Sequence, residues 1–124
     1  MQQVKVSSKV TAAALVIRLA GEIDHVSAGD AAARLARAVA SLPPPGAVIL
    51  DLTNVSLLSA AGLRTVHGCA VACVERGLLA RLVVAPGTVV HRVVSLLPLD
   101  PRVSTFDTAD QALRALDPAP PATC

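Results

Sequence analysis

Hydrophobic and polar positions follow two alternating patterns along the chain. Short apolar runs that end at glycine or polar residues predict β-strands. Between these runs, apolar residues recur at three- and four-residue spacing with polar residues on the other side, which predicts amphipathic helices. The expected strands are Gln3–Val6, Ala14–Ala20, Ala47–Leu52, Leu82–Ala85 and Val103–Phe106, and the expected helices begin near Ser27, Ala60, Pro86 and Thr108.

Turn and capping residues mark the ends of these elements. A polar connection, Ser7–Ala12, joins the first two strands, and the second strand is expected to stop at Gly21, so the chain should open with a hairpin. Three consecutive prolines, Pro43–Pro45, end the first helix. Thr108 is followed three residues later by Gln111, which predicts the N-cap of the last helix.

Strands that alternate with helices predict an α/β domain. We expect a mostly parallel sheet of four to five strands, an N-terminal hairpin and about four helices. The chain has 124 residues, of which 53% are hydrophobic, and this is enough for a single domain with one core. We place that domain at residues 1–116 and expect residues 117–124, which are rich in proline, to form a disordered tail.

Charge and composition exclude several classes of function. The net charge is +2 and the basic residues are scattered, so nucleic acid and anionic membranes are not expected partners. A single aromatic residue, Phe106, leaves no platform for stacking bases. No apolar stretch reaches the ~20 residues that span a bilayer, and the first residues lack the apolar core of a signal peptide. We therefore expect a cytoplasmic protein.

Candidate residues for catalysis or metal binding do not form a recognisable set. His25, His67 and His91 lie far apart, and no pair has the spacing of metal ligands. The chain has no G-x-S-x-G, G-x-G-x-x-G or P-loop motif. We expect no metal, no cofactor and no enzymatic activity.

The three cysteines are expected to be reduced thiols. Cys69 and Cys73 lie four residues apart on one predicted helix and therefore point to the same face, where we interpret them as core residues. Cys124 lies in the proline-rich tail. Redox activity of any of these thiols stays open at this point.

The segment Asp51–Leu63 runs from a buried strand into the start of a helix. The N-terminus of a helix presents unpaired N–H groups and a partial positive charge, and so favours a carboxylate, a phosphate or a phosphoserine. Ser59 is placed to be the N-cap, a role worth about 1 kcal/mol relative to alanine. Gly62 is expected where the helix approaches the sheet closely.

Three blocks of the sequence together resemble the STAS domain of bacterial anti-sigma factor antagonists. They are Gly21-Glu22-Ile23-Asp24, then Val48–Val55, then Leu57–Leu63, and the order of elements agrees over about residues 3–116. The resemblance implies a non-enzymatic binding protein whose partner is an anti-sigma factor of the ATP-binding, histidine-kinase-like type. In that family the unphosphorylated antagonist binds the kinase and releases a sigma factor.

The sequence departs from the family pattern at the phosphorylation site. The usual junction reads hydrophobic-hydrophobic-Asp-Ser-Ser-Gly-Leu, with one serine phosphorylated by the partner. Here Ser59 occupies the aspartate position, and Ala60 and Ala61 occupy the two serine positions, with Ala61 at the position that the resemblance implies for the usual phosphoacceptor. Gly62 and Leu63 are retained. Three readings stay open: Ser59 is a displaced acceptor, the protein binds permanently without phosphorylation, or it has a different partner.

The resemblance also implies where the partner binds. In a parallel sheet whose strands are each followed by a helix, the carboxyl ends of the strands lie along one edge, and this edge is the expected partner surface. The expected partner-binding residues are Gly21, Glu22, Asp24, Ser56, Leu58, Ser59, Ala60, Ala61 and Gly62.

Three alternatives to this function stay open. They are a non-phosphorylatable scaffold subunit of a stress-signalling assembly, a homodimer, and an enzyme or nucleotide-binding protein.

Overall fold

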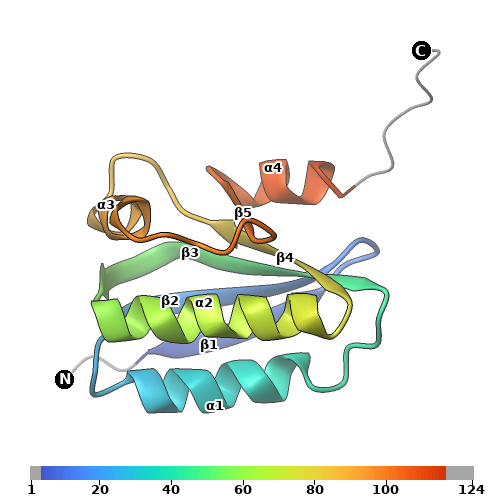
Figure 1. The fold of residues 1–124 in the computed structure, drawn as a ribbon, viewed down its shortest axis with the longest axis horizontal. Helices are drawn as coiled ribbons and strands as arrows, with labels where there is room; N and C mark the ends of the chain where they lie inside the picture. The colour runs from blue at the N-terminus through green and yellow to red at the C-terminus, as the bar shows by residue number, and fades with distance from the viewer. Residues whose placement is uncertain (1–3, 117–124) are drawn as a thin grey trace.

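The computed structural model describes residues 4–116, which form a five-stranded sheet and four helices (Figure 1). The strands lie in chain order, with β1 antiparallel to β2 and all other neighbours parallel. This confirms the α/β class, the mostly parallel sheet and the opening hairpin. The expected tail, 117–124, lies outside the described residues. The elements are β1 (Lys5–Val10), β2 (Leu15–Ile23), α1 (Ala28–Val39), β3 (Gly46–Leu58), α2 (Ala60–Glu75), β4 (Leu78–Val83), α3 (Val89–Leu96), β5 (Ser104–Phe106) and α4 (Ala109–Arg114).

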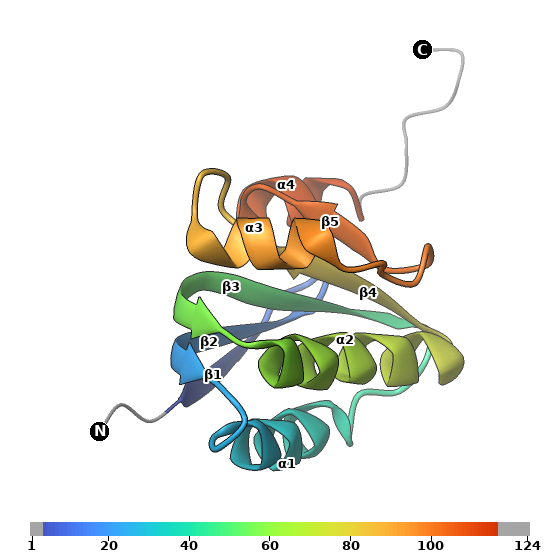
Figure 2. The ribbon, with the colours of Figure 1, turned by 60° about the vertical axis from the view of Figure 1, so that its left-hand side comes forward.

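Helices cover both faces of the sheet (Figures 1 and 2). α1 and α2 lie side by side on one face, and α4 lies on the opposite face, where it contacts β3, β4 and β5. α3 packs against β3, near the end of that strand from which α2 begins. Because β2 and β3 are parallel neighbours, their carboxyl ends meet at one edge of the sheet, and α2 begins at the same edge.

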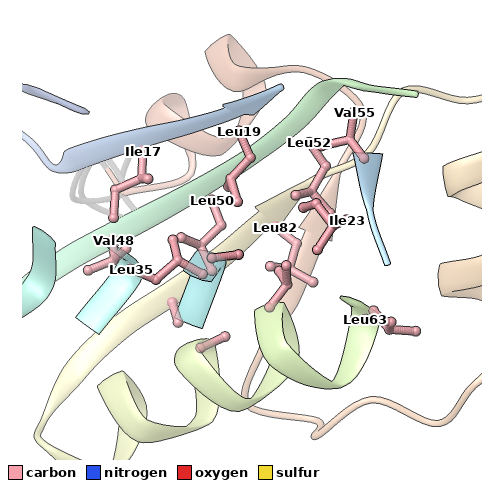
Figure 3. Close-up of a cluster of buried hydrophobic side chains, with 14 of the residues drawn as sticks. Ile17, Leu19, Ile23, Leu35, Val48, Leu50, Leu52, Val55, Leu63 and Leu82 are labelled. Atoms are coloured by element: carbon pink, nitrogen blue, oxygen red, sulfur yellow. The ribbon is translucent and has the colours of Figure 1, made fainter. Parts of the chain in front are cut away.

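The larger part of the core lies between the sheet and helices α1 and α2 (Figure 3). Ile17 and Leu50 from the sheet are fully buried there, as are Leu35 of α1 and Leu63 of α2. Each such side chain contributes about 1.5–3 kcal/mol when it leaves water. A smaller cluster on the other face contains Ala14, Val16, Ala47, Ile49, Val83 and Ala112.

β1 and β2 are both longer than expected. The predicted connection Ser7–Ala12 is mostly strand, because β1 continues to Val10. As an edge strand, β1 has mostly exposed side chains, so its polar residues show no buried pattern. The prediction that β2 stops at Gly21 is also wrong, since the strand continues to Ile23. Gly21 has a φ of 95° and lies next to a register shift, where a residue without a side chain accommodates the bulge.

β4 begins earlier than the sequence predicted, at Leu78 and not at Leu82, and it ends at Val83. Its first half alternates: Leu78 and Ala80 are buried, whereas Leu79 is 51% exposed. The unbroken apolar run that identified the strand, Leu82–Ala85, therefore covers only the last two residues of β4.

β3 extends well past Leu52, where the sequence predicted its end. Two register shifts against β2 each add one extra residue to β3. As a result, the core-facing residues of this segment, Leu52, Val55 and Leu58, are three positions apart instead of two. A three-residue spacing does not indicate a strand in a sequence. The pairs on either side of the shifts are Arg18 with Asp51 and Ala20 with Asn54, then Gly21 with Val55 and Glu22 with Leu57.

Candidate partner-binding site

Two segments that are distant in the chain meet at the edge where β2 and β3 end (Figure 2). One is 21–27, the end of β2 and the loop to α1, and the other is 56–62, the end of β3 and the first turn of α2. We call these two segments the strand-end surface. All residues that the sequence predicted for partner binding lie within it. Leu58 and Gly62 are buried, however, so they support this surface from beneath and do not form its exposed part.

Ser59 links β2 to the first turn of α2. Its N–H donates to the Ile23 carbonyl oxygen at 3.0 Å, and its Oγ accepts a hydrogen bond from the Gly62 N–H at 3.0 Å. The Ser59 hydroxyl also donates to the Ile23 carbonyl oxygen, at 3.4 Å. This confirms that Ser59 is the N-cap of α2. The Ser59 hydroxyl therefore both donates and accepts a hydrogen bond within the chain.

Gly62 lies where α2 approaches the end of β2 most closely. A Cβ atom at this position would overlap with the carbonyl oxygen of Ile23 and would lie 3.0 Å from its carbonyl carbon. The close approach expected from the sequence is thus present, and only glycine permits it without a shift of the backbone. Packing at Gly62 fixes the distance between the first turn of α2 and the end of β2.

Asp24 organises the loop between β2 and α1. Its Oδ1 accepts hydrogen bonds from the N–H groups of Val26 and Ser27, both at 2.9 Å. The Ser27 hydroxyl donates to the Glu22 carbonyl oxygen at 2.9 Å. The pKa of the Asp24 carboxyl is lowered, chiefly by the hydrogen bond from the Ser27 N–H. Asp24 therefore shapes this loop as a turn residue.

Asp51 is the single charged residue buried within residues 4–116. It is the last residue of β3 that pairs with β4, and the first bulge follows it. Its Oδ1 accepts hydrogen bonds from the N–H and the hydroxyl of Thr53, and Arg18 Nε lies 3.8 Å from its Oδ2. Asp51 thus secures β3 at the point where it leaves β4 and continues toward the strand-end surface.

The cysteines of α2 share one face, as the sequence predicted. Cys69 is half-buried and Cys73 is buried. The pKa of Cys73 is lowered to about 7, mainly because the Cys69 thiol donates a hydrogen bond to its sulfur, with a smaller effect of the positive Arg76. The same interaction raises the pKa of Cys69, as does its burial. Cys124 lies outside the described residues.

The histidines do not come together. His67 Nε2 accepts a hydrogen bond from the Asp100 N–H at 2.9 Å, which joins α2 to the segment before β5. Across residues 4–116, no three potential metal ligands of the His, Cys, Asp or Glu type are grouped. None of the helices described is long and apolar enough to cross a bilayer.

A model of the STAS domain family matches residues 3–112 of the chain. The chain belongs to the STAS domain family. No curated protein sequence matches it.

Solved structures of STAS proteins share this fold. An anti-sigma factor antagonist from Mycobacterium paratuberculosis is 26% identical to the chain with a TM-score of 0.78, and the match covers 94% of this chain and 96% of the other. A STAS domain protein from Planctomyces limnophilus, also an anti-sigma-factor antagonist, is 19% identical with a TM-score of 0.69, over 94% and 98% of the two chains. Unphosphorylated SpoIIAA, the Bacillus antagonist, is 20% identical with a TM-score of 0.56, over 90% and 96%.

Two exposed apolar side chains of this STAS domain lie on the strand-end surface and were missed in the sequence. Val26, in the loop before α1, is 72% exposed, and Leu57, beside Glu22 in the sheet, is 42% exposed. Single apolar residues in a loop and at a bulge carry no signal of exposure, because their direction depends on the local backbone. The structure shows that the STAS surface at this edge is more apolar than its carboxylates suggest.

Proposed function

We propose that this STAS domain is an anti-sigma factor antagonist that binds its partner through the strand-end surface without a phosphorylation switch. The observation that carries the proposal is the first turn of α2. Ala60 and Ala61 stand where the family has hydroxyl side chains, and the neighbouring hydroxyl, on Ser59, is engaged by Gly62 and Ile23. Without a phosphorylation switch, the fraction of the protein that is bound depends on the concentrations of the antagonist and its partner.

The role of antagonist is supported by similarity over nearly the whole chain. The match to the Mycobacterium paratuberculosis antagonist covers 94% of this chain at 26% identity. The partner we propose is an anti-sigma factor of the kinase type, because the blocks at 21–24 and 57–63 resemble the part of the family that such kinases bind.

The surface itself suits sustained contact with a partner. Val26 and Leu57 present apolar area, and Ala60, on the first turn of α2, is also exposed. Glu22 is half-buried, and no described cation lies within ion-pair distance of it. An apolar centre with a carboxylate near it favours a complementary surface that is apolar with a basic residue at its border.

Ser59 is poorly placed to replace the missing acceptor. Its Oγ lies between the Gly62 N–H and the Ile23 carbonyl oxygen. A phosphoryl group on Oγ would remove the proton that is donated to Ile23 and would place acceptor oxygens near that carbonyl. We therefore propose that Ser59 is a structural cap and that the chain stays unphosphorylated at this position.

The test combines binding with intact-mass measurement, using a purified kinase-type anti-sigma factor from the same organism with and without ATP. We expect a stable complex that ATP does not dissociate, and no mass increase in the chain. Ala61→Ser should gain one phosphate and lose the partner when ATP is added, whereas Ala60→Ser is the matched control. Absence of any complex, or a phosphate on the unaltered chain that Ser59→Ala removes, would contradict the proposal.

A further inference from the structure

We propose that Cys69 and Cys73 form a two-thiolate binding site for a soft metal ion of the Cu(I) class, in the groove between α1 and α2. The groove has a volume of about 410 Å³ and is lined by small side chains of both helices and by the two cysteines. It lies on the face of α2 that is turned toward α1. The small residues that border the thiols are Ala32, Ala36, Gly68 and Ala72.

The spacing of the thiols suits a bridging ion better than a disulfide. Side chains four residues apart on a helix have Cβ atoms about 5–6 Å apart. A disulfide needs Cβ atoms about 3.5–4.5 Å apart, so Cys69 and Cys73 cannot form one while α2 stays helical. Both cysteines line the same groove, so one ion placed between them can bind both sulfurs.

The ligands available around Cys69 and Cys73 determine which kind of metal ion the site can bind. Thiolate ligands favour soft ions such as Cu(I), which are satisfied by few ligands, whereas structural zinc sites use four. Within the described residues no third His, Cys, Asp or Glu side chain joins the pair to form a metal-binding group. The side chains that line the groove include one hydroxyl, that of Thr65, but no carboxylate or amide oxygen of the kind that Mg²⁺ and Ca²⁺ prefer.

Arg76 supplies the charge that the bound form needs. Binding of a monovalent ion releases both thiol protons and leaves one net negative charge on the site. Arg76 lines the same groove, and its guanidinium is held by the carbonyl oxygens of Val39, at 3.1 Å, and Leu42, at 2.9 Å. These contacts are with neutral groups, so its positive charge is available to the dithiolate. No ion pair of Arg76 occurs among the described residues.

The test measures Cu(I) binding without oxygen, in competition with a chromogenic Cu(I) chelator, on the full chain carrying Cys124→Ser. This background removes the third thiol. We expect one Cu(I) per chain, and we expect Cys69→Ala or Cys73→Ala to weaken binding by about 100-fold or more, beyond the usual effect of an outer-shell change. Circular dichroism and a thermal melt verify that each variant is folded. Retained affinity in either folded variant would overturn the proposal.

A spacing control separates a geometric site from two thiols in general. Gly68→Cys with Cys69→Ala keeps two thiols on α2 but places them five residues apart, and a side chain at position 68 meets open space. This variant should not bind. Thr65→Cys with Cys73→Ala recreates the four-residue spacing with Cys69 inside the same groove and should regain binding. Equal binding by the five-residue variant, or no recovery in the folded four-residue variant, would contradict the assigned geometry.

Discussion

Gly62 of α2 packs onto the backbone of Ile23 so closely that a methyl group at position 62 would overlap with the Ile23 carbonyl oxygen. The same carbonyl accepts a hydrogen bond from the Ser59 N–H. One peptide group at the end of β2 therefore fixes both the start of α2 and its distance from the sheet. The strand-end surface depends on this contact for its shape.

Gly62→Ala is expected to destabilise the domain by about 1–3 kcal/mol, because the backbone of α2 or β2 must move to admit the methyl group. Gly68→Ala is the matched control on the same helix. It meets no atom within 4 Å, and it should stabilise the domain by about 0.5–1 kcal/mol through helix propensity. Urea unfolding of both variants measures the difference. Equal stability of the two would show that the contact at Gly62 relaxes without cost.

Ser59→Ala should lower the free energy of unfolding by about 1 kcal/mol, because the Gly62 N–H loses its acceptor. Ser59→Asp should keep most of that stability, since a carboxylate caps equally well and favours the helix N-terminus. Ser56→Ala is the control, because Ser56 is exposed and its hydroxyl makes one long contact, 3.3 Å, with the Gly21 carbonyl oxygen. A larger loss at Ser56 than at Ser59 would contradict the capping role.

The stability of the loop before α1 should depend on pH through Asp24. Its pKa is lower in the folded chain than the ordinary value of 3.8, so the ionised form stabilises the fold. This contribution is fully present above about pH 4 and is lost as the pH falls through the folded pKa. Asp24→Asn should remove that part of the acid dependence. An NMR titration in which the Asp24 carboxyl changes at or above the ordinary value would contradict this expectation.

Leu57→Glu and Val26→Glu should each weaken binding of the anti-sigma factor by about tenfold or more, which corresponds to roughly 1.4 kcal/mol. Both side chains are exposed, so the domain should keep its stability. Val10→Glu is the control, because Val10 is 78% exposed and pairs with Leu15 at the start of β2, at the opposite end of the sheet. Calorimetry with the partner distinguishes these cases, and an equal effect of Val10→Glu would exclude a contact specific to the strand-end surface.

The thiols of α2 should ionise in two well-separated steps. In a Cys124→Ser background, ultraviolet absorbance should report the first thiolate near pH 7, the lowered pKa of Cys73, and the chain has no Trp or Tyr to obscure the signal. Cys69→Ala removes the hydrogen-bond donor, so the remaining thiol should ionise closer to the ordinary value of about 8.5. A first ionisation unaffected by Cys69→Ala would show that the two sulfurs do not interact.

Rules that use only neighbouring residues predicted the structure correctly where apolar residues recur at a regular spacing. The buried residues of α1 are Ala31, Leu35 and Val39, and they follow the kind of apolar spacing that predicted the first helix. Capping rules identified Thr108, whose hydroxyl accepts from the Gln111 N–H at 3.1 Å. Each of these features is determined by residues within a few positions of one another.

The sequence was insufficient where a neighbouring strand decides the outcome. The bulges of β3 follow from its pairing with β2, and they place Leu57 toward solvent while Leu58 turns inward. The exposure of Val26 depends on the turn that Asp24 and Ser27 hold. The sequence therefore located the candidate site but did not show which of its side chains reach the surface.

β3 continues past the last residue that β4 pairs with, so residues 52–58 are hydrogen-bonded within the sheet to β2 alone. A segment with one strand neighbour opens more readily than the sheet interior, because fewer backbone hydrogen bonds must break. Residues 48–51 pair with both β2 and β4, so this part of β3 keeps the core closed. Residues 52–58 can therefore adjust to a partner while the rest of β3 and the domain stay folded.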